Sequence, residues 1–90
     1  MKEVVRHYTD RAKKDLLSLD KHIANRIVAK IKEYSETPDP LACAKALSGN
    51  LSGRFRYRVG DYRVIFVVDA AGAVTVLSII TIRHRKEAYR

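Results

Sequence analysis

The sequence predicts an α+β protein, a two-layer sandwich in which a helical hairpin packs on an antiparallel sheet in the order β-α-α-β-β-β. Two consecutive amphipathic helical patterns in the first half, strand patterns throughout the second half and a short β-prone opening lead to this expectation. The chain has 90 residues, of which 47% are hydrophobic. Because that length supports a single modest core, we expect one domain spanning residues 1–90.

The chain is expected to open with a strand that leads directly into a helix. Residues 3–8 read EVVRHY, a short β-prone run. Thr9 and Asp10 follow, and they suit the cap and the first turn of a helix. We expect this first helix to run to about Leu19, with a tight link to the next.

A second, longer helix is expected to begin after Asp20, which can cap it, and to end before Pro38. Its apolar stripe recurs at helical spacing and consists of Ile23, Ile27, Ile31 and Tyr34. Residues 41–53, LACAKALSGNLSG, are small and rich in glycine and serine. This composition is typical of a loop with room for one helical turn.

The second half is expected to form a meander of strands at residues 54–59, 62–68 and 74–82. Gly60-Asp61 suits a two-residue turn, because glycine at its first position accommodates the backbone that such turns need. That turn places Arg58 directly opposite Arg63 on the neighbouring strand.

The second turn of the meander is expected at Asp69–Gly72. If Val68 pairs with Ala73, then Ser78 lies opposite Arg63 on the last strand. A shift of one residue in this turn would move the last strand's side chains to the other face, so the register depends on the turn.

Arginines are concentrated on one face of the predicted hairpin. Alternation places these side chains away from the helices: Arg54, Arg56, Arg58 and Arg63. Like charges directly opposed on a sheet destabilise it by roughly 0.2 to 1 kcal/mol per pair, so folding alone does not favour them. The formal net charge is +8, from 18 Lys and Arg against 10 Asp and Glu. Both observations indicate an anionic partner such as nucleic acid.

Other features of the sequence exclude several classes of protein. The single cysteine, Cys43, rules out an intrachain disulfide, and no Cys/His cluster has the spacing of a zinc site. The N-terminus lacks an apolar leader, and the longest apolar run, VIFVV, is too short to span a bilayer. We therefore expect a cytoplasmic protein that is not inserted in a membrane and needs no metal or other cofactor.

The second half of the chain resembles the RelE/ParE superfamily of toxins from toxin-antitoxin systems. The resemblance rests on Leu47 and Gly49, the Arg-hydrophobic-Arg strand, GDYRV at residues 60–64, the valine-rich last strand, and HRKEAY at residues 84–89. The order of the predicted elements agrees over the whole chain, whereas the motifs begin at about Leu47.

The resemblance implies a fold and a function. In the RelE branch it implies a messenger-RNA endonuclease that acts in the ribosomal A site without metal and is held inactive by a cognate antitoxin. In the ParE branch it implies a toxin that binds DNA gyrase and is not a nuclease. By position, the resemblance implies a RelE-like catalytic set of Arg56, Arg58, Arg63, Arg85 and Tyr89. RelE-type members often have lysine on the hairpin strand, where this chain has arginine at both positions.

The chemistry of RNA cleavage is compatible with these residue types. RNA carries its own nucleophile in the 2′-hydroxyl, so a protein can cleave it by orienting that oxygen, stabilising charge on the phosphate and transferring two protons. Arginines suit the second task but stay protonated, so His84 is the best local candidate for the general base. Tyr89 would stack on a splayed base. We expect further RNA contacts from Arg54, Arg83 and Lys86.

A third reading remains open besides the nuclease and the gyrase-binding toxin. The same arginines can form a docking surface for RNA or an acidic peptide in a module without catalytic activity. His84 is then a solvated or phosphate-contacting histidine, and Tyr57 and Tyr62 belong to the core, because they alternate with the arginines.

Overall fold

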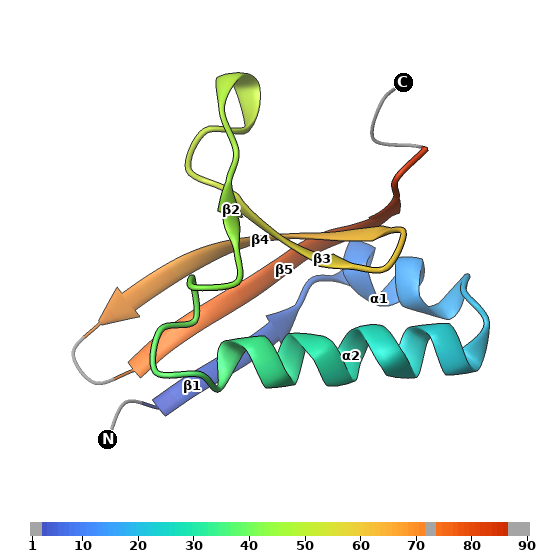
Figure 1. The fold of residues 1–90 in the computed structure, drawn as a ribbon, viewed down its shortest axis with the longest axis horizontal. Helices are drawn as coiled ribbons and strands as arrows, with labels where there is room; N and C mark the ends of the chain where they lie inside the picture. Colours follow the sequence, from blue (N-terminus) through green and yellow to red (C-terminus); the bar gives the residue numbers. More distant parts are fainter. Residues whose placement is uncertain (1–2, 72–73, 87–90) are drawn as a thin grey trace.

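The computed structural model describes residues 3–71 and 74–86. The elements, in chain order, are β1 (Glu3–Tyr8), α1 (Asp10–Leu17), α2 (Lys21–Ser35), β2 (Lys45–Ala46), the 3₁₀ helix η1 (Gly49–Leu51), β3 (Phe55–Val59), β4 (Tyr62–Ala71) and β5 (Val74–His84). The strands form one sheet in the order β1-β5-β4-β3-β2, and both helices cover the same face of it (Figure 1). The predicted α+β sandwich is confirmed.

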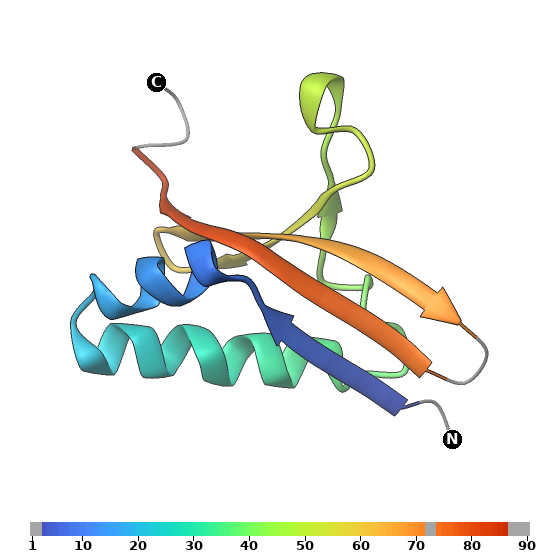
Figure 2. The ribbon, with the colours of Figure 1, turned by 180° about the vertical axis from the view of Figure 1, so that it is seen from behind.

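The sheet is mixed, and the prediction of a purely antiparallel sheet was wrong. β1 pairs with β5 in parallel, from Glu3 opposite Val74 to Tyr8 opposite Ile79. The helical hairpin returns the chain to the other edge of the sheet, and β1 then occupies the edge of β5 that β4 leaves open (Figure 2). Since an open edge exposes unpaired backbone groups, this arrangement satisfies the last strand on both sides.

The region predicted to be a loop contains two short elements. β2 adds to the outer edge of β3, with Lys45 opposite Arg56. The predicted helical turn is present as η1. β2 gives little sequence signal because it has only two residues and lies among small ones.

The helix boundaries follow the predicted caps with small differences. The Thr9 side chain accepts a hydrogen bond from the Ala12 N–H at 3.2 Å, which confirms Thr9 as the cap of α1. α1 ends at Leu17, two residues before the predicted Leu19. Asp20 precedes α2 as predicted, although its side chain makes no capping hydrogen bond.

The core lies between the helices and the covered face of the sheet. It consists of the buried side chains Ala12, Ile27, Ile31, Tyr57, Val59, Val64, Phe66, Leu77, Ile79 and Ile82. Tyr57 is fully buried and stacks on Phe66, with ring centroids 4.3 Å apart. Its hydroxyl donates to the Pro40 carbonyl at 2.6 Å. Tyr57 is therefore a core residue, as predicted, that also holds the loop after α2.

The register of the β3–β4 hairpin is as predicted, whereas that of β4 with β5 is not. Val59 pairs with Tyr62, and Arg58 pairs with Arg63. β4 continues to Ala71, through the predicted turn at Asp69–Gly72, so that only residues 72–73 separate it from β5. This shorter turn, together with a β-bulge in β5, places Arg63 opposite Arg83 and not opposite Ser78.

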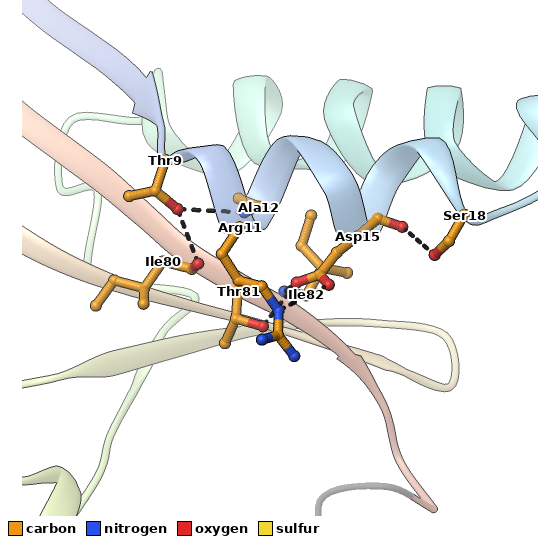
Figure 3. Close-up of polar contacts among 8 residues, drawn as sticks. All are labelled: Thr9, Arg11, Ala12, Asp15, Ser18, Ile80, Thr81 and Ile82. Carbon is orange, nitrogen blue, oxygen red and sulfur yellow. Dashed lines mark hydrogen bonds and ion pairs between the residues drawn. The ribbon is translucent and has the colours of Figure 1, made fainter.

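A β-bulge completes this change of register. Phe66 pairs with Ile79 and Ile65 with Thr81, which leaves Ile80 as the extra residue of β5. The Thr9 hydroxyl donates to the Ile80 carbonyl at 2.9 Å (Figure 3). Without the bulge, the register that pairs Phe66 with Ile79 would continue and place Ile82 opposite Arg63. The bulge thus turns Arg83 to the open face of the sheet and Ile82 to the core.

No helix within residues 3–71 and 74–86 is long and apolar enough to cross a membrane.

Candidate functional site

Three arginines form a row across the open face of the sheet, the face away from the helices. Arg58 on β3 pairs with Arg63 on β4, and Arg63 pairs with Arg83 on β5. Directly paired residues point to the same side of a sheet, so the three guanidinium groups lie on one face. We call Arg58, Arg63 and Arg83, together with Arg56, the arginine face.

The remaining cations of the hairpin extend this face toward β2. Arg56 lies one side-chain repeat from Arg58 and pairs with Lys45. Arg54 lies just before β3, where its carbonyl accepts a hydrogen bond from the Leu47 N–H at 2.9 Å. Arg54 precedes the strand, so its place on the arginine face stays a prediction. Lys45 was not predicted from the sequence, because its only signal is membership of a strand two residues long.

The open face lies between two projecting segments. The chain around η1 and the last described residues after β5 both rise from the sheet on the side opposite the helices (Figures 1 and 2). Arg58 and Arg83 are exposed to solvent, while Arg56 and Arg63 are partly buried. The arrangement can accommodate a polyanion that lies along the sheet, because phosphates favour arginine's planar donors.

The two basic residues after β5 lie beyond the ladder. The Arg85 N–H donates to the Asp61 carbonyl at 2.6 Å, which fastens the chain to the β3–β4 turn. Lys86 follows, and both side chains are exposed. Arg85, the residue expected in the catalytic set, is thus outside the row, whereas Arg83, expected only as an RNA contact, is in it.

His84 lies on the opposite face from the arginines. It pairs with Tyr62, and the two rings meet edge to face with centroids 5.2 Å apart. Both side chains border a cavity shared with α2. The Nδ1 atom of His84 accepts a hydrogen bond from the Lys86 N–H at 3.2 Å. The structure therefore does not bring His84 together with the arginine face, and Tyr89 lies outside the described residues.

A polar contact between α1 and β5 holds the segment of β5 next to Arg83 of the arginine face. One carboxylate oxygen of Asp15 accepts from the Thr81 hydroxyl at 2.7 Å and from the Ile82 N–H at 3.0 Å (Figure 3). Burial opposes ionisation of this carboxyl, but the hydrogen bonds from Ile82, Thr81 and Arg11 outweigh it and lower the pKa of Asp15. This role of Asp15 was not predictable from the sequence, since nothing in the pattern of a helix distinguishes an aspartate that makes such a contact.

The described part of the chain, residues 3–71 and 74–86, contains no group of three or more His, Cys, Asp or Glu side chains that could hold a metal ion.

Comparisons with known proteins agree with this fold. Residues 7–89 match the family described as the ParE toxin of the type II toxin-antitoxin system, parDE. Toxin RelG of Mycobacterium tuberculosis is 31% identical over 86 residues, which cover 92% of each chain.

Solved structures resemble the chain over nearly its whole length. A chain of the toxin-antitoxin complex RelBE2 from Mycobacterium tuberculosis has a TM-score of 0.74 and 27% identity, over 94% of both chains. A RelB-RelE complex from Methanococcus jannaschii has a TM-score of 0.61 and 25% identity, over 92% of this chain and 94% of that one. The YoeB/ParE toxin from Agrobacterium tumefaciens, with a TM-score of 0.67 and 22% identity over 91% and 97% of the chains, shares the fold.

Proposed function

The chain belongs to the ParE toxin family of type II toxin-antitoxin systems, within the RelE/ParE superfamily, and we propose that this toxin blocks translation by cleaving messenger RNA on the ribosome. The observation that carries the proposal is the row Arg58, Arg63 and Arg83. Arg63 has an arginine directly opposite on each side, and this concentration of planar guanidinium donors on one face suits the binding of phosphates.

The proposed reaction uses the RNA's own 2′-hydroxyl as nucleophile. The arginine face holds the scissile phosphate so that this oxygen lies in line with the leaving 5′-oxygen, and it stabilises the charge that develops on the phosphate. The 2′-hydroxyl gives up its proton and bonds to phosphorus, while the 5′-oxygen leaves and takes up a proton, giving a 2′,3′-cyclic phosphate and a 5′-hydroxyl. This route needs no metal ion, because guanidinium groups supply the positive charge that metals supply in other nucleases.

The proposed partners are a cognate antitoxin, the ribosome and its messenger RNA, in the cytoplasm. The similar RelBE2 and RelB-RelE structures are complexes of toxin with antitoxin. An acidic antitoxin segment over the arginine face would exclude RNA by competing for the same charges. β5 lies inside the sheet, so an added antitoxin strand would have to pair at the outer edge of β1, or on the other side at β2 and the part of β3 that β2 leaves uncovered.

Primer extension on translated messenger RNA, in a purified translation system, tests the proposal. The wild-type protein should produce discrete cuts, and Arg63→Ala or Arg83→Ala should reduce cleavage by about 100-fold or more, as when one transition-state donor is lost. Arg85→Ala should cost less, because Arg85 lies outside the row. Lys13→Ala, which replaces an exposed lysine on α1, is the matched control.

A ParE-like toxin that binds DNA gyrase is the second candidate, favoured by the family match over residues 7–89. A supercoiling assay with purified gyrase separates the two. Inhibition of gyrase that survives Arg63→Ala and Arg83→Ala, with intact messenger RNA, would replace the nuclease by the second candidate. RNA binding without cleavage and without effect on gyrase would leave a plain RNA-binding module.

A further inference from the structure

A cavity of about 370 Å³ opens at the end of the β3–β4 hairpin, between the sheet and the first turns of α2. Its walls come from α2, from the hairpin turn and from the end of β5. It lies on the helix side of the sheet and so is separate from the arginine face. A volume of this size falls within the range of small-molecule pockets.

The lining combines an apolar floor with aromatic and basic walls, and Asp61 of the hairpin turn also borders the cavity. Ile27 and Val59 are buried at the floor. Tyr62 and His84, in edge-to-face contact, form an aromatic wall. An apolar floor and an aromatic wall do not stabilise a bare phosphate, whereas both stabilise a flat heteroaromatic ring.

Two basic side chains of α2 border the same cavity. His22 and Arg26 are exposed and lie one helical turn apart. The Arg26 guanidinium lies over the turn, since its Nη1 atom is 3.8 Å from the position a Cβ on Gly60 would take. A guanidinium plane can stack on a base, and both side chains can donate hydrogen bonds to base edges or to a flanking phosphate.

The cavity and the arginine face meet at the tip of the same hairpin. Val59 and Tyr62, which border the cavity, are the pair next to Arg58 and Arg63. His84 likewise follows Arg83. Neighbouring residues of a β-strand point to opposite faces and lie about 3.3 Å apart along the chain. A flexible RNA strand that leaves the arginines can therefore reach the cavity by passing around the tip of the hairpin.

We propose that this cavity binds a nucleobase of the RNA strand whose phosphates lie on the arginine face. The inference rests on the proposed function and adds to it a base-binding subsite outside the site of cleavage. It assigns to His84 and Tyr62 a place in substrate recognition, on the face where the structure has them.

Two 2′-O-methyl RNA trinucleotides provide the test, one with all its bases and one fully abasic, because the 2′-O-methyl group prevents cleavage. The wild-type protein should bind the base-containing probe about tenfold more tightly, the scale of one stacked base. The double variant His22→Ala/Arg26→Ala should lose this preference, because the two probes then bind with similar affinity, whatever part of the affinity for phosphate the two side chains contribute. Lys32→Ala, which removes an exposed charge elsewhere on α2, should retain both.

Imidazole NMR signals give a second readout that needs no variant. The chain has three histidines, and His7 lies on β1, away from the cavity. The signals of His22 and His84 should shift with the base-containing probe more than with the abasic one, while that of His7 stays in place. A double variant that keeps its preference for bases, or equal shifts with both probes, overturns the inference.

The possible failures are distinguishable. If the wild-type protein binds both probes equally, the proposed function stands and the base site is wrong. If it binds neither, RNA recognition itself fails. If the double variant weakens binding of the cognate antitoxin and leaves the base preference unchanged, the cavity belongs to the antitoxin and the inference is overturned.

Discussion

The direction of single side chains decides which groups can act on one phosphate. His84 is next to Arg83 in the chain, yet it points to the helix side with Tyr62. A general base must come within hydrogen-bond reach of the proton it removes. The strand backbone separates this imidazole from the arginine face, which leaves it poorly placed for a 2′-hydroxyl bound there.

His84→Ala should therefore reduce cleavage by less than about tenfold, well short of the 100-fold to 10,000-fold that a general base contributes. Primer extension on translated messenger RNA measures this, with Arg63→Ala as the comparison. A loss of about 100-fold at saturating substrate would show that His84 reaches the reacting atoms in the bound state.

Tyr57 combines burial with one strong hydrogen bond. Burial, together with the nearby Cys43 and Asp39, raises the pKa of Tyr57 to about 12. Because the folded pKa lies above the unfolded value of about 10, this tyrosine contributes stability that is complete below pH 10 and is lost as the pH rises toward 12.

Tyr57→Phe should lower the free energy of unfolding by about 1 kcal/mol at pH 7, since the Pro40 carbonyl loses its donor. The variant should also lose less stability than the wild type between about pH 10 and pH 12. Urea unfolding across this range measures both effects. Tyr34→Phe, in the ring that packs 5.3 Å from Tyr57, is the control and should keep the wild-type alkaline loss.

At the scale of elements, α1 and its cap provide hydrogen-bond partners for the edge of β5 beyond the end of β1. Thr9 binds the carbonyls of Ile79 and Ile80, and Asp15 accepts from Ile82. These contacts satisfy backbone groups of β5 around the bulge, and the bulge in turn places Arg83 opposite Arg63. The helix and its cap therefore contribute to the geometry of the arginine face through their hydrogen bonds to β5.

Asp15→Ala should lower the free energy of unfolding by about 1 to 3 kcal/mol at pH 7, because the Ile82 N–H and the Thr81 hydroxyl lose their acceptor. The folded pKa of Asp15 is lowered, so its contribution is present above the unfolded carboxyl pKa of about 3.9 and is lost as the pH falls through the folded value.

Urea unfolding at pH 7 and at pH 3 tests this account. The difference between Asp15→Ala and the wild type should shrink at the lower pH. Asp69→Ala, which replaces an exposed carboxylate on β4, should change little at either pH. An Asp15 effect of equal size at both values would mean that the carboxylate charge contributes nothing.

Elements with local signals were predictable from the sequence, and those fixed by distant pairing were not. Thr9 as a cap and the tight turn at Gly60-Asp61 follow from local chemistry, and both are confirmed. The parallel pairing of β1 and the bulge at Ile80 depend on which strand edge remains open, and neither position carries a glycine or proline to mark it.

At the scale of the whole molecule, the two kinds of basic side chain lie on different faces. The helices carry exposed lysines, whereas the open face of the sheet carries arginines. Strand alternation, together with the two-residue turn at Gly60-Asp61, predicted Arg56, Arg58 and Arg63 on one face. The partner of Arg63 on β5 was not predictable, because it depends on a turn and a bulge that together shift the register.

The concentration of arginines on one face predicts the salt dependence of RNA binding. Each phosphate contact with single-stranded RNA contributes about −0.7 to the slope of log K against log salt concentration. Four contacts, one for each residue of the arginine face, give a slope of about −3, or roughly 50-fold weaker binding between 50 and 200 mM salt. Arg58→Ala/Arg63→Ala should reduce the slope to about −1.5, because two contacts disappear. Lys13→Ala/Lys14→Ala removes the same charge from the exposed side of α1 and should leave the slope unchanged.

Fluorescence anisotropy with a 2′-O-methyl RNA oligonucleotide measures the slopes. If the two double variants lower the slope equally, net charge and not the arginine face governs binding, and a slope near zero for the wild type would remove the basis for an RNA substrate.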